Sequence, residues 1–187
     1  MIAQIFDLDC FKILSVFALA PGMRLRRQEL KQKTKLNNVP LDGALARLAS
    51  AKILLKEKKL FVVNFENVQS KPVISLISQQ YKMMRELPLD VYFFLLDVSN
   101  KLTTTTPIEL WLFGSYAKLI YKENSDVDIA LLAPKNFDKE FAIKLMQKFE
   151  KKYDKNIELH VFDKARFYKN KRDPLVKEIL RAGLRLI

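Results

Sequence analysis

Two aspartates separated by a single residue, Asp126 and Asp128, form the clearest candidate metal site in the sequence. They begin the run 126–132, whose apolar residues predict a β-strand. Since alternate residues of a strand point to the same face, both carboxylates are expected on one side of a sheet. Like charges so close together repel each other, and a divalent cation would relieve that repulsion. Oxygen ligands of this kind suit Mg²⁺, or Mn²⁺ in its place.

Gly114 and Ser115 precede the two aspartates and are candidates for binding phosphate. They follow the apolar run 108–113, a predicted strand, and precede a predicted helix from Tyr116 to about Tyr121. Glycine lets the backbone approach a phosphate closely, the helix N-terminus offers free N–H groups, and the serine hydroxyl adds a donor. Metal ions beside such a turn could align an attacking oxygen with a nucleotide's α-phosphate and stabilise the leaving pyrophosphate.

These residues resemble the nucleotidyltransferase superfamily that includes DNA polymerase β, poly(A) polymerases and kanamycin nucleotidyltransferase. The minimal nucleotidyltransferases are the most similar branch. The shared pattern is Gly-Ser, ten residues and then Asp-x-Asp, with a resemblance that covers about residues 108–182. The resemblance implies a metal-dependent enzyme that transfers a nucleoside monophosphate onto a hydroxyl group. ATP is the expected donor, so the group transferred would be AMP.

The sequence departs from the family pattern at two positions. Leu119 stands where family members usually have glycine. The resemblance places a third carboxylate on a later strand, here 156–162, and the acid at that position is Glu158 where an aspartate is usual. His160 lies on the same face of that strand and could support Glu158, although a structural role is the simpler interpretation.

The resemblance also implies partners. Minimal nucleotidyltransferases often accompany HEPN-type proteins in toxin–antitoxin systems and modify the partner protein or a tRNA. A nucleic-acid acceptor, DNA included, is a further possibility because this chain has a basic N-terminal region. The alternative hypothesis is a DNA-binding regulator whose nucleotidyltransferase domain is inert or senses nucleotide.

The N-terminal region predicts three helices followed by a β-hairpin. Asp9 is expected to cap the first helix, which ends before Pro21 and Gly22. A second helix is predicted over 27–35, a third from Pro40, and a hairpin over 53–63. This order resembles a winged helix-turn-helix domain over about residues 8–65.

Basic residues of this region are candidates for contacting nucleic acid. Residues 1–65 contain 12 Lys and Arg against 5 Asp and Glu, and the whole chain has a formal charge of +12. Phosphate contacts, which position a protein without specifying sequence, suit these side chains. The candidates are Arg24, Arg26, Arg27, Lys31, Lys33, Lys35, Arg47, Lys56, Lys58 and Lys59.

The predicted fold class is α+β, in three parts. Residues 1–66 form the winged helix domain, 67–105 a helical linker of two helices broken at Pro88, and 106–187 a nucleotidyltransferase domain in which helices flank a mixed sheet. The run from Thr103 to Pro107 predicts a turn or linker before a strand. The single cysteine, Cys10, excludes an internal disulfide, and no apolar run is long enough to cross a membrane, so a cytoplasmic protein is expected.

Overall fold

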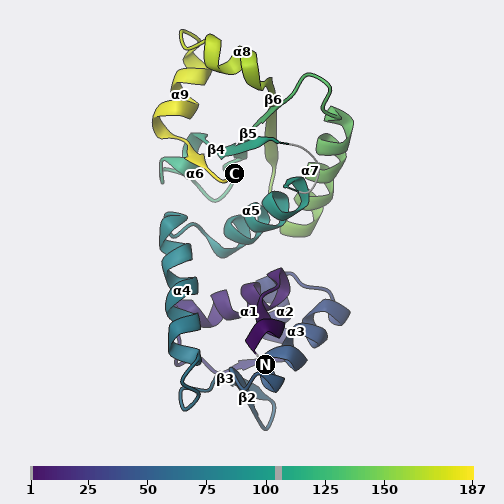
Figure 1. Ribbon diagram of the computed structural model, residues 1–187, viewed down its shortest axis with the longest axis vertical. Helices are drawn as coiled ribbons and strands as arrows, with labels where there is room; N and C mark the ends of the chain where they lie inside the picture. The colour runs from purple at the N-terminus through teal and green to yellow at the C-terminus, as the bar shows by residue number, and fades with distance from the viewer. Residues whose placement is uncertain (1, 104–106) are drawn as a thin grey trace. The chain divides into compact units, whose positions relative to one another are not determined.

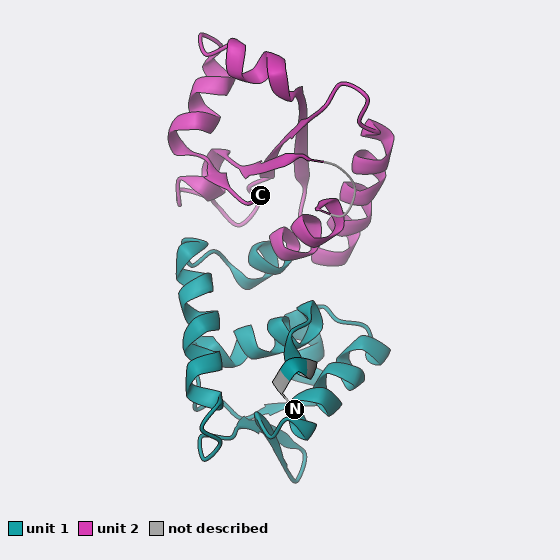
Figure 2. Cartoon of the chain, viewed as in Figure 1, with its two compact units in different colours: residues 1–93 teal, residues 94–187 magenta. Residues whose placement is uncertain are grey.

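The computed structural model describes residues 2–103 and 107–187, so most of the threonine run expected as a turn lies outside the described residues. The chain divides into two compact units, residues 1–93 and 94–187 (Figure 2). The boundary falls inside one helix, α5, which spans Leu89–Leu102. Pro88 immediately precedes α5 and separates it from α4, Ser70–Met83, as the sequence predicts.

The N-terminal unit contains helices and a small antiparallel sheet (Figure 1). Its other elements are η1 Ile2–Ile5, α1 Leu8–Leu19, β1 Leu25–Arg26, α2 Arg27–Thr34, α3 Asn38–Ser50, β2 Leu54–Glu57 and β3 Leu60–Val63. The sheet order is β1-β3-β2. The hairpin turn between β2 and β3 places Lys58 at φ 57°, a left-handed conformation that a tight turn requires. The predicted hairpin is therefore confirmed.

The first helix starts differently from the expectation. Asp7, not Asp9, is its N-cap residue, and the Asp7 side chain accepts hydrogen bonds from the backbone N–H groups of Asp9 and Cys10. Asp9 lies in the first turn, where its negative charge interacts favourably with the positive end of the helix dipole. The apolar side chains of α1 are buried, Ile13 and Phe17 among them, and the helix packs against α3 and α4.

The C-terminal unit is a mixed sheet with flanking helices, as predicted. Its elements beyond α5 are β4 Glu109–Leu112, α6 Gly114–Ala117, β5 Val127–Ala133, α7 Lys139–Tyr153, β6 Ile157–Asp163, α8 Lys164–Lys169, α9 Pro174–Ala182 and β7 Leu184–Arg185. The strand order is β6-β5-β4-β7. β5 and β6 are parallel and joined through α7, whereas β4 is antiparallel to both β5 and β7.

The two faces of this sheet have different roles. On one face Phe113, Ala130 and Leu132 pack against Phe167 of α8 and Ile179 of α9. Leu110, Ile129 and Leu131 are buried on the other face. Figure 1 shows α8 and α9 on one side of the strands and α7 on the other. Both faces are therefore covered, and the predicted site lies at the start of β5.

None of the helices in the described part of the chain is both long enough and apolar enough to cross a membrane.

Candidate active site and nucleic-acid interface

Gly114 connects β4 to α6 and lies directly against Asp128. Its backbone has φ +66°, a conformation that favours glycine. A Cβ atom at this position would lie 1.8 Å from Oδ2 of Asp128. This contact follows from the register of the sheet, because β4 and β5 pair Leu112 with Ile129 and the Phe113 N–H donates to the Asp128 carbonyl. The structure thus brings the candidate phosphate-binding turn and a candidate metal ligand into contact.

Asp128 is held by the same turn. The backbone N–H of Ser115 donates to its carboxylate, so this donor is engaged inside the protein. The Ser115 hydroxyl makes no hydrogen bond with any residue that the structure describes, which leaves it available to a ligand. Burial and then the negative charge of Glu158 raise the pKa of Asp128, with a smaller contribution from Asp126, while the Ser115 N–H and His160 oppose the shift.

Glu158 is the register partner of Asp128 on the neighbouring parallel strand β6. Its carboxylate lies 2.9 Å from Nε2 of His160, two residues further along the same strand. The His160 ring packs edge-on against Phe113 with centroids 5.3 Å apart, and it stacks with Phe162. His160 is therefore a support that orients Glu158, while the Glu158 side chain itself remains exposed.

The three acids differ in exposure, and the metal site stays a prediction. Asp126 and Glu158 are exposed and Asp128 is half-buried. Within residues 2–103 and 107–187, no three His, Cys, Asp or Glu side chains are arranged to hold one ion as they stand. The donor chemistry fits a hard cation nonetheless, because the negative charges of Glu158 and Asp126 both act on Asp128 and oxygen ligands suit Mg²⁺ or Mn²⁺.

The helix after the turn is shorter than predicted. It ends at Ala117 rather than near Tyr121. Leu119 has φ 59°, in the left-handed region, which stops the helix and explains why glycine would suit this position. Beyond it, Tyr121 stacks on the buried Tyr116 with centroids 4.5 Å apart. An ion pair also joins this turn to α9, because Lys118 Nζ lies 2.6 Å from the Glu178 carboxylate.

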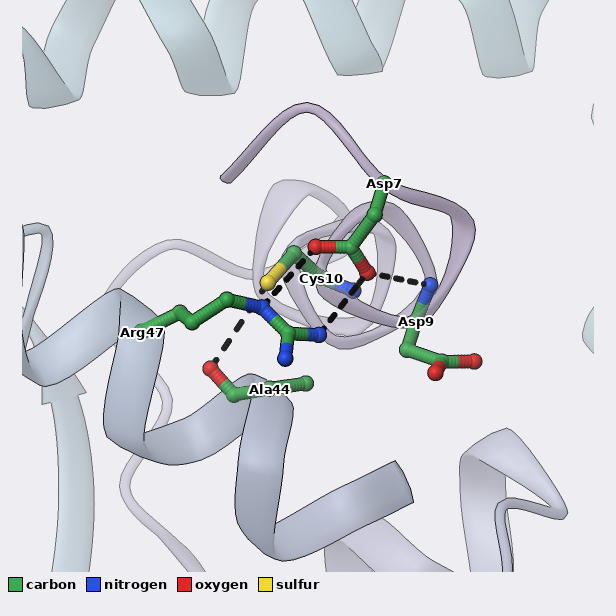
Figure 3. Close-up of polar contacts among 5 residues, drawn as sticks. All are labelled: Asp7, Asp9, Cys10, Ala44 and Arg47. Carbon is green, nitrogen blue, oxygen red and sulfur yellow. Dashed lines mark hydrogen bonds and ion pairs between the residues drawn. The ribbon is translucent and has the colours of Figure 1, made fainter. Parts of the chain in front are cut away.

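Three of the ten basic side chains expected to contact nucleic acid are engaged inside the N-terminal unit. Arg27 makes two hydrogen bonds to Asp42, at 2.6 and 2.8 Å, and Arg24 pairs with Glu57. Arg47 binds both carboxylate oxygens of Asp7, at 3.0 and 3.1 Å, and so joins α3 to the start of α1 (Figure 3).

The Arg47 contact is part of a small network. The Cys10 thiol faces the Ala44 carbonyl at 3.6 Å, and burial raises the pKa of Cys10 to about 12, which keeps it protonated and unreactive (Figure 3). Burial alone would raise the pKa of Asp7, but the Cys10 N–H and Arg47 lower it below its usual value.

The other seven candidates make no ion pair with an acid that the structure describes. They are Arg26, Lys31, Lys33, Lys35, Lys56, Lys58 and Lys59. Arg26, Lys56 and Lys59 line one pocket of about 530 Å³, formed between α2, α3 and the hairpin. The pocket floor includes apolar groups such as Leu45 and Ala49 of α3. The structure thus brings these three cations together on one side of α3.

Sequence reasoning gave no role to Glu109, which the structure shows to be buried in the C-terminal unit. Its carboxylate accepts from the Tyr168 hydroxyl at 2.5 Å and lies 2.9 Å from Lys164 Nζ, so it fastens α8 to β4. Burial alone would raise the pKa of Glu109, but Tyr168, Lys164 and Trp111 lower it. The sequence did contain an indication of this role, because a charged residue inside the apolar strand 108–113 must find a partner if it is buried.

A comparison with protein families bears on the C-terminal unit. Residues 97–187 match the family model described as polymerase beta, nucleotidyltransferase. The C-terminal unit is therefore a nucleotidyltransferase domain. Two solved structures are similar, a toxin–antitoxin with AMP-PNP (23% identity) and a mutant of the toxin–antitoxin MntA–HpeT (24% identity). Each alignment covers 50% of this chain and 70% or 72% of the other chain, with a TM-score of 0.39. A comparison with curated proteins gave no match.

Proposed function

We propose that the C-terminal unit transfers a nucleoside monophosphate, with ATP as donor, to a hydroxyl of a protein or nucleic-acid acceptor. The observation that carries this proposal is the contact between Gly114 and Asp128, in which a phosphate-binding turn meets a carboxylate so closely that only glycine fits. The family match of residues 97–187 supports the same chemistry.

Each residue of the proposed site has a separate role. The backbone of Gly114 and the free hydroxyl of Ser115 bind the nucleotide's phosphates. Asp126 and Asp128 hold Mg²⁺ or Mn²⁺, with Glu158 as third ligand or as the base that accepts the acceptor's proton. The metal, when bound, supplies positive charge that offsets the carboxylates' repulsion and stabilises charge on the phosphates. His160 keeps Glu158 oriented through their 2.9 Å contact.

The partners belong to the same proposal. A toxin–antitoxin setting, in which a HEPN-type protein or a tRNA is the acceptor, follows from the resemblance to minimal nucleotidyltransferases.

Transfer of labelled nucleotide in the presence of Mg²⁺ or Mn²⁺ tests the activity. Asp126→Asn and Asp128→Asn should each abolish transfer, because an amide keeps the shape of the carboxylate but loses the charge that holds the metal. Gly114→Ala should also abolish it, since the added Cβ meets Oδ2 of Asp128. Asp154→Asn is the matched control, as this exposed residue has φ 53°, which asparagine tolerates. Full activity in both Asn variants of the pair would refute the site.

For the N-terminal unit we propose a winged helix domain that binds duplex DNA with little sequence preference. The supporting observation is the pocket beside α3, where Arg26, Lys56 and Lys59 converge. Phosphate contacts by such side chains give affinity that falls steeply with salt. Tight binding to a single sequence that persists at high salt would contradict this part of the proposal.

The same observation favours the second candidate function, a regulator that binds DNA while its nucleotidyltransferase domain is inert or senses nucleotide. The two candidates differ in one measurement. An active enzyme transfers label to an acceptor, whereas the regulator binds DNA in a salt-dependent manner and transfers nothing with any acceptor offered.

A further inference from the structure

A pocket in the C-terminal unit lies at the opposite end of β5 from Asp128. It is formed where the parallel strands β5 and β6 end, at Ala133 and Asp163, and has a volume of about 200 Å³. The C-terminal ends of parallel strands are a common place for ligands in sheets with helical crossovers. Three basic side chains line it: Lys135 precedes α7, Lys139 is the first residue of α7, and Arg166 belongs to α8.

The three cations outnumber the single carboxylate in the pocket lining. None of them makes an ion pair with an acid in the part of the chain that the structure describes. Asp163 is the one carboxylate in the lining, and it is already engaged, because it caps α8 by accepting from the Arg166 N–H at 2.9 Å. The pocket is therefore positive and has free donors.

The surroundings extend this positive charge. The segment 164–172, which contains α8 and the residues that follow it, has five basic residues and no acidic one. Of these five, Lys164 pairs with Glu109, and the others are Arg166, Lys169, Lys171 and Arg172. Such a density of one sign along a surface favours a polyanion over a single small anion.

The size of the pocket points in the same direction. Pockets that enclose a whole small molecule occupy about 300–1,000 Å³. The pocket at the end of β5, at about 200 Å³, is below that range, so it suits one phosphate group better than an entire nucleotide. A single phosphate recognised within a longer basic surface is what the backbone of a nucleic acid offers.

We propose that Lys135, Lys139 and Arg166 bind a backbone phosphate of a nucleic-acid strand. Ala133 is five residues beyond Asp128 on β5, which is about 17 Å at ~3.3 Å per residue. A strand anchored in the pocket is thus close enough for a nearby hydroxyl to reach the carboxylates. That the bound strand is the acceptor rests on the proposed transferase activity, whereas the binding site itself does not.

Binding of a fluorescent single-stranded oligonucleotide to the full chain, without nucleotide or metal, tests the pocket. The variant is the triple substitution Lys135→Ala, Lys139→Ala and Arg166→Ala. The control is Lys144→Ala, Lys148→Ala and Lys177→Ala, which removes the same charge from exposed positions that do not line the pocket. With about 0.7 of a unit of salt slope for each phosphate neutralised on a single strand, the pocket variant should lose about 0.7 of a unit of slope, because the pocket holds one phosphate. The control should keep the wild-type slope.

Three outcomes separate the possibilities. Equal weakening by the pocket and control variants overturns the proposal, because only net charge would then matter. Inorganic phosphate that binds the wild type but not the pocket variant, while oligonucleotide binding is unchanged, overturns it in favour of a small-anion site. If the slope changes as expected, and Asp126→Asn leaves it unchanged, the binding site stands even where no nucleotide transfer is detected.

Discussion

At the scale of single residues, the contact between Gly114 and Asp128 decides the geometry of the site. Asp128 is half-buried, and its carboxylate accepts a hydrogen bond from the Ser115 N–H. The negative charges of Glu158 and Asp126 repel it. Its raised pKa means that the folded protein binds this proton more tightly than the unfolded chain does. The ionised form of Asp128 therefore lowers the free energy of unfolding once the pH exceeds 3.8, the ordinary pKa of an aspartate.

Asp128→Asn should consequently stabilise the metal-free protein at neutral pH while it removes activity. Repulsion between neighbouring like charges suggests a gain of a few tenths to about 1 kcal/mol in the free energy of unfolding. Thermal melts across pH measure it, and the gain should disappear as the pH falls below the usual aspartate range, where the wild-type carboxyl is protonated too. A gain that persisted unchanged in acid would rule out this electrostatic explanation.

The left-handed backbone conformation of Leu119 leads to a second prediction. A non-glycine residue in the left-handed region is strained by about 1 kcal/mol or more. Leu119→Gly should therefore be more stable than Leu119→Ala by about 1 kcal/mol, although both remove the leucine side chain beyond Cβ. Lys118, which has ordinary helical angles, is the matched control, and there alanine should be the more stable of the two. Chemical denaturation of the four variants tests this, and alanine preferred at both positions would contradict it.

At the scale of elements, the basic side chains of the N-terminal unit fall into two classes. Arg47 joins α3 to the N-terminus of α1 through Asp7, a structural function. Lys56 and Lys59 extend from the hairpin into the pocket beside α3 and have no acidic partner among the described residues. Ion pairs made within a unit stabilise it, whereas unpaired cations on one side of it are available to phosphates.

Substitutions should separate these two classes. Lys56→Ala and Lys59→Ala should each reduce the salt slope of duplex DNA binding by about 0.9 of a unit and leave the melting temperature unchanged. Arg47→Ala should leave the slope unchanged and lower stability by about 0.5–1 kcal/mol, because its pair with Asp7 is partly exposed. Fluorescence anisotropy in a salt series, with melts of the same proteins, provides both readouts. A smaller slope for Arg47→Ala would place this side chain on DNA instead.

At the scale of the whole molecule, the unfolding of the two compact units can be followed by different spectroscopic signals. The chain contains one tryptophan, Trp111, which lies on β4 in the C-terminal unit. Its fluorescence therefore reports on the nucleotidyltransferase unit, whereas far-ultraviolet circular dichroism reports on the helices of both units. Ligands that bind one unit can be assigned by comparing the two signals.

An ATP analogue with Mg²⁺ should raise the melting temperature seen by Trp111 fluorescence. A ligand at about one hundred times its Kd stabilises the folded state by roughly 2.7 kcal/mol. Duplex DNA should instead stabilise the part of the circular dichroism transition that Trp111 does not follow. The Asp126→Asn variant, which lacks one proposed metal ligand, should show a smaller nucleotide-induced shift. A Trp111 transition that no nucleotide moves, at any metal concentration, would argue against nucleotide binding by this unit.

The sequence by itself determined the features that depend on neighbours along the chain. Alternating and helical patterns located most strands and helices, Pro88 separated α4 from α5, and the order of Gly-Ser and Asp-x-Asp pointed to the nucleotidyltransferase domain. No helix was placed over α7, α8 or α9, even though Ala142, Met146, Phe149 and Tyr153 of α7 follow a helical spacing and are buried. The end of α6 was misplaced because a left-handed Leu119 is not evident from residue type.

Only the tertiary structure decided which distant groups meet. The contact of Gly114 with Asp128 depends on the register between β4 and β5, and the place of Glu158 beside Asp128 depends on the pairing of β5 with β6. Arg47 and Asp7 are 40 residues apart, so their pairing required α3 to pack on α1. The pocket of Lys135, Lys139 and Arg166 forms where two strands end together. Such contacts depend on packing between elements, which fixes positions in space that local propensity does not specify.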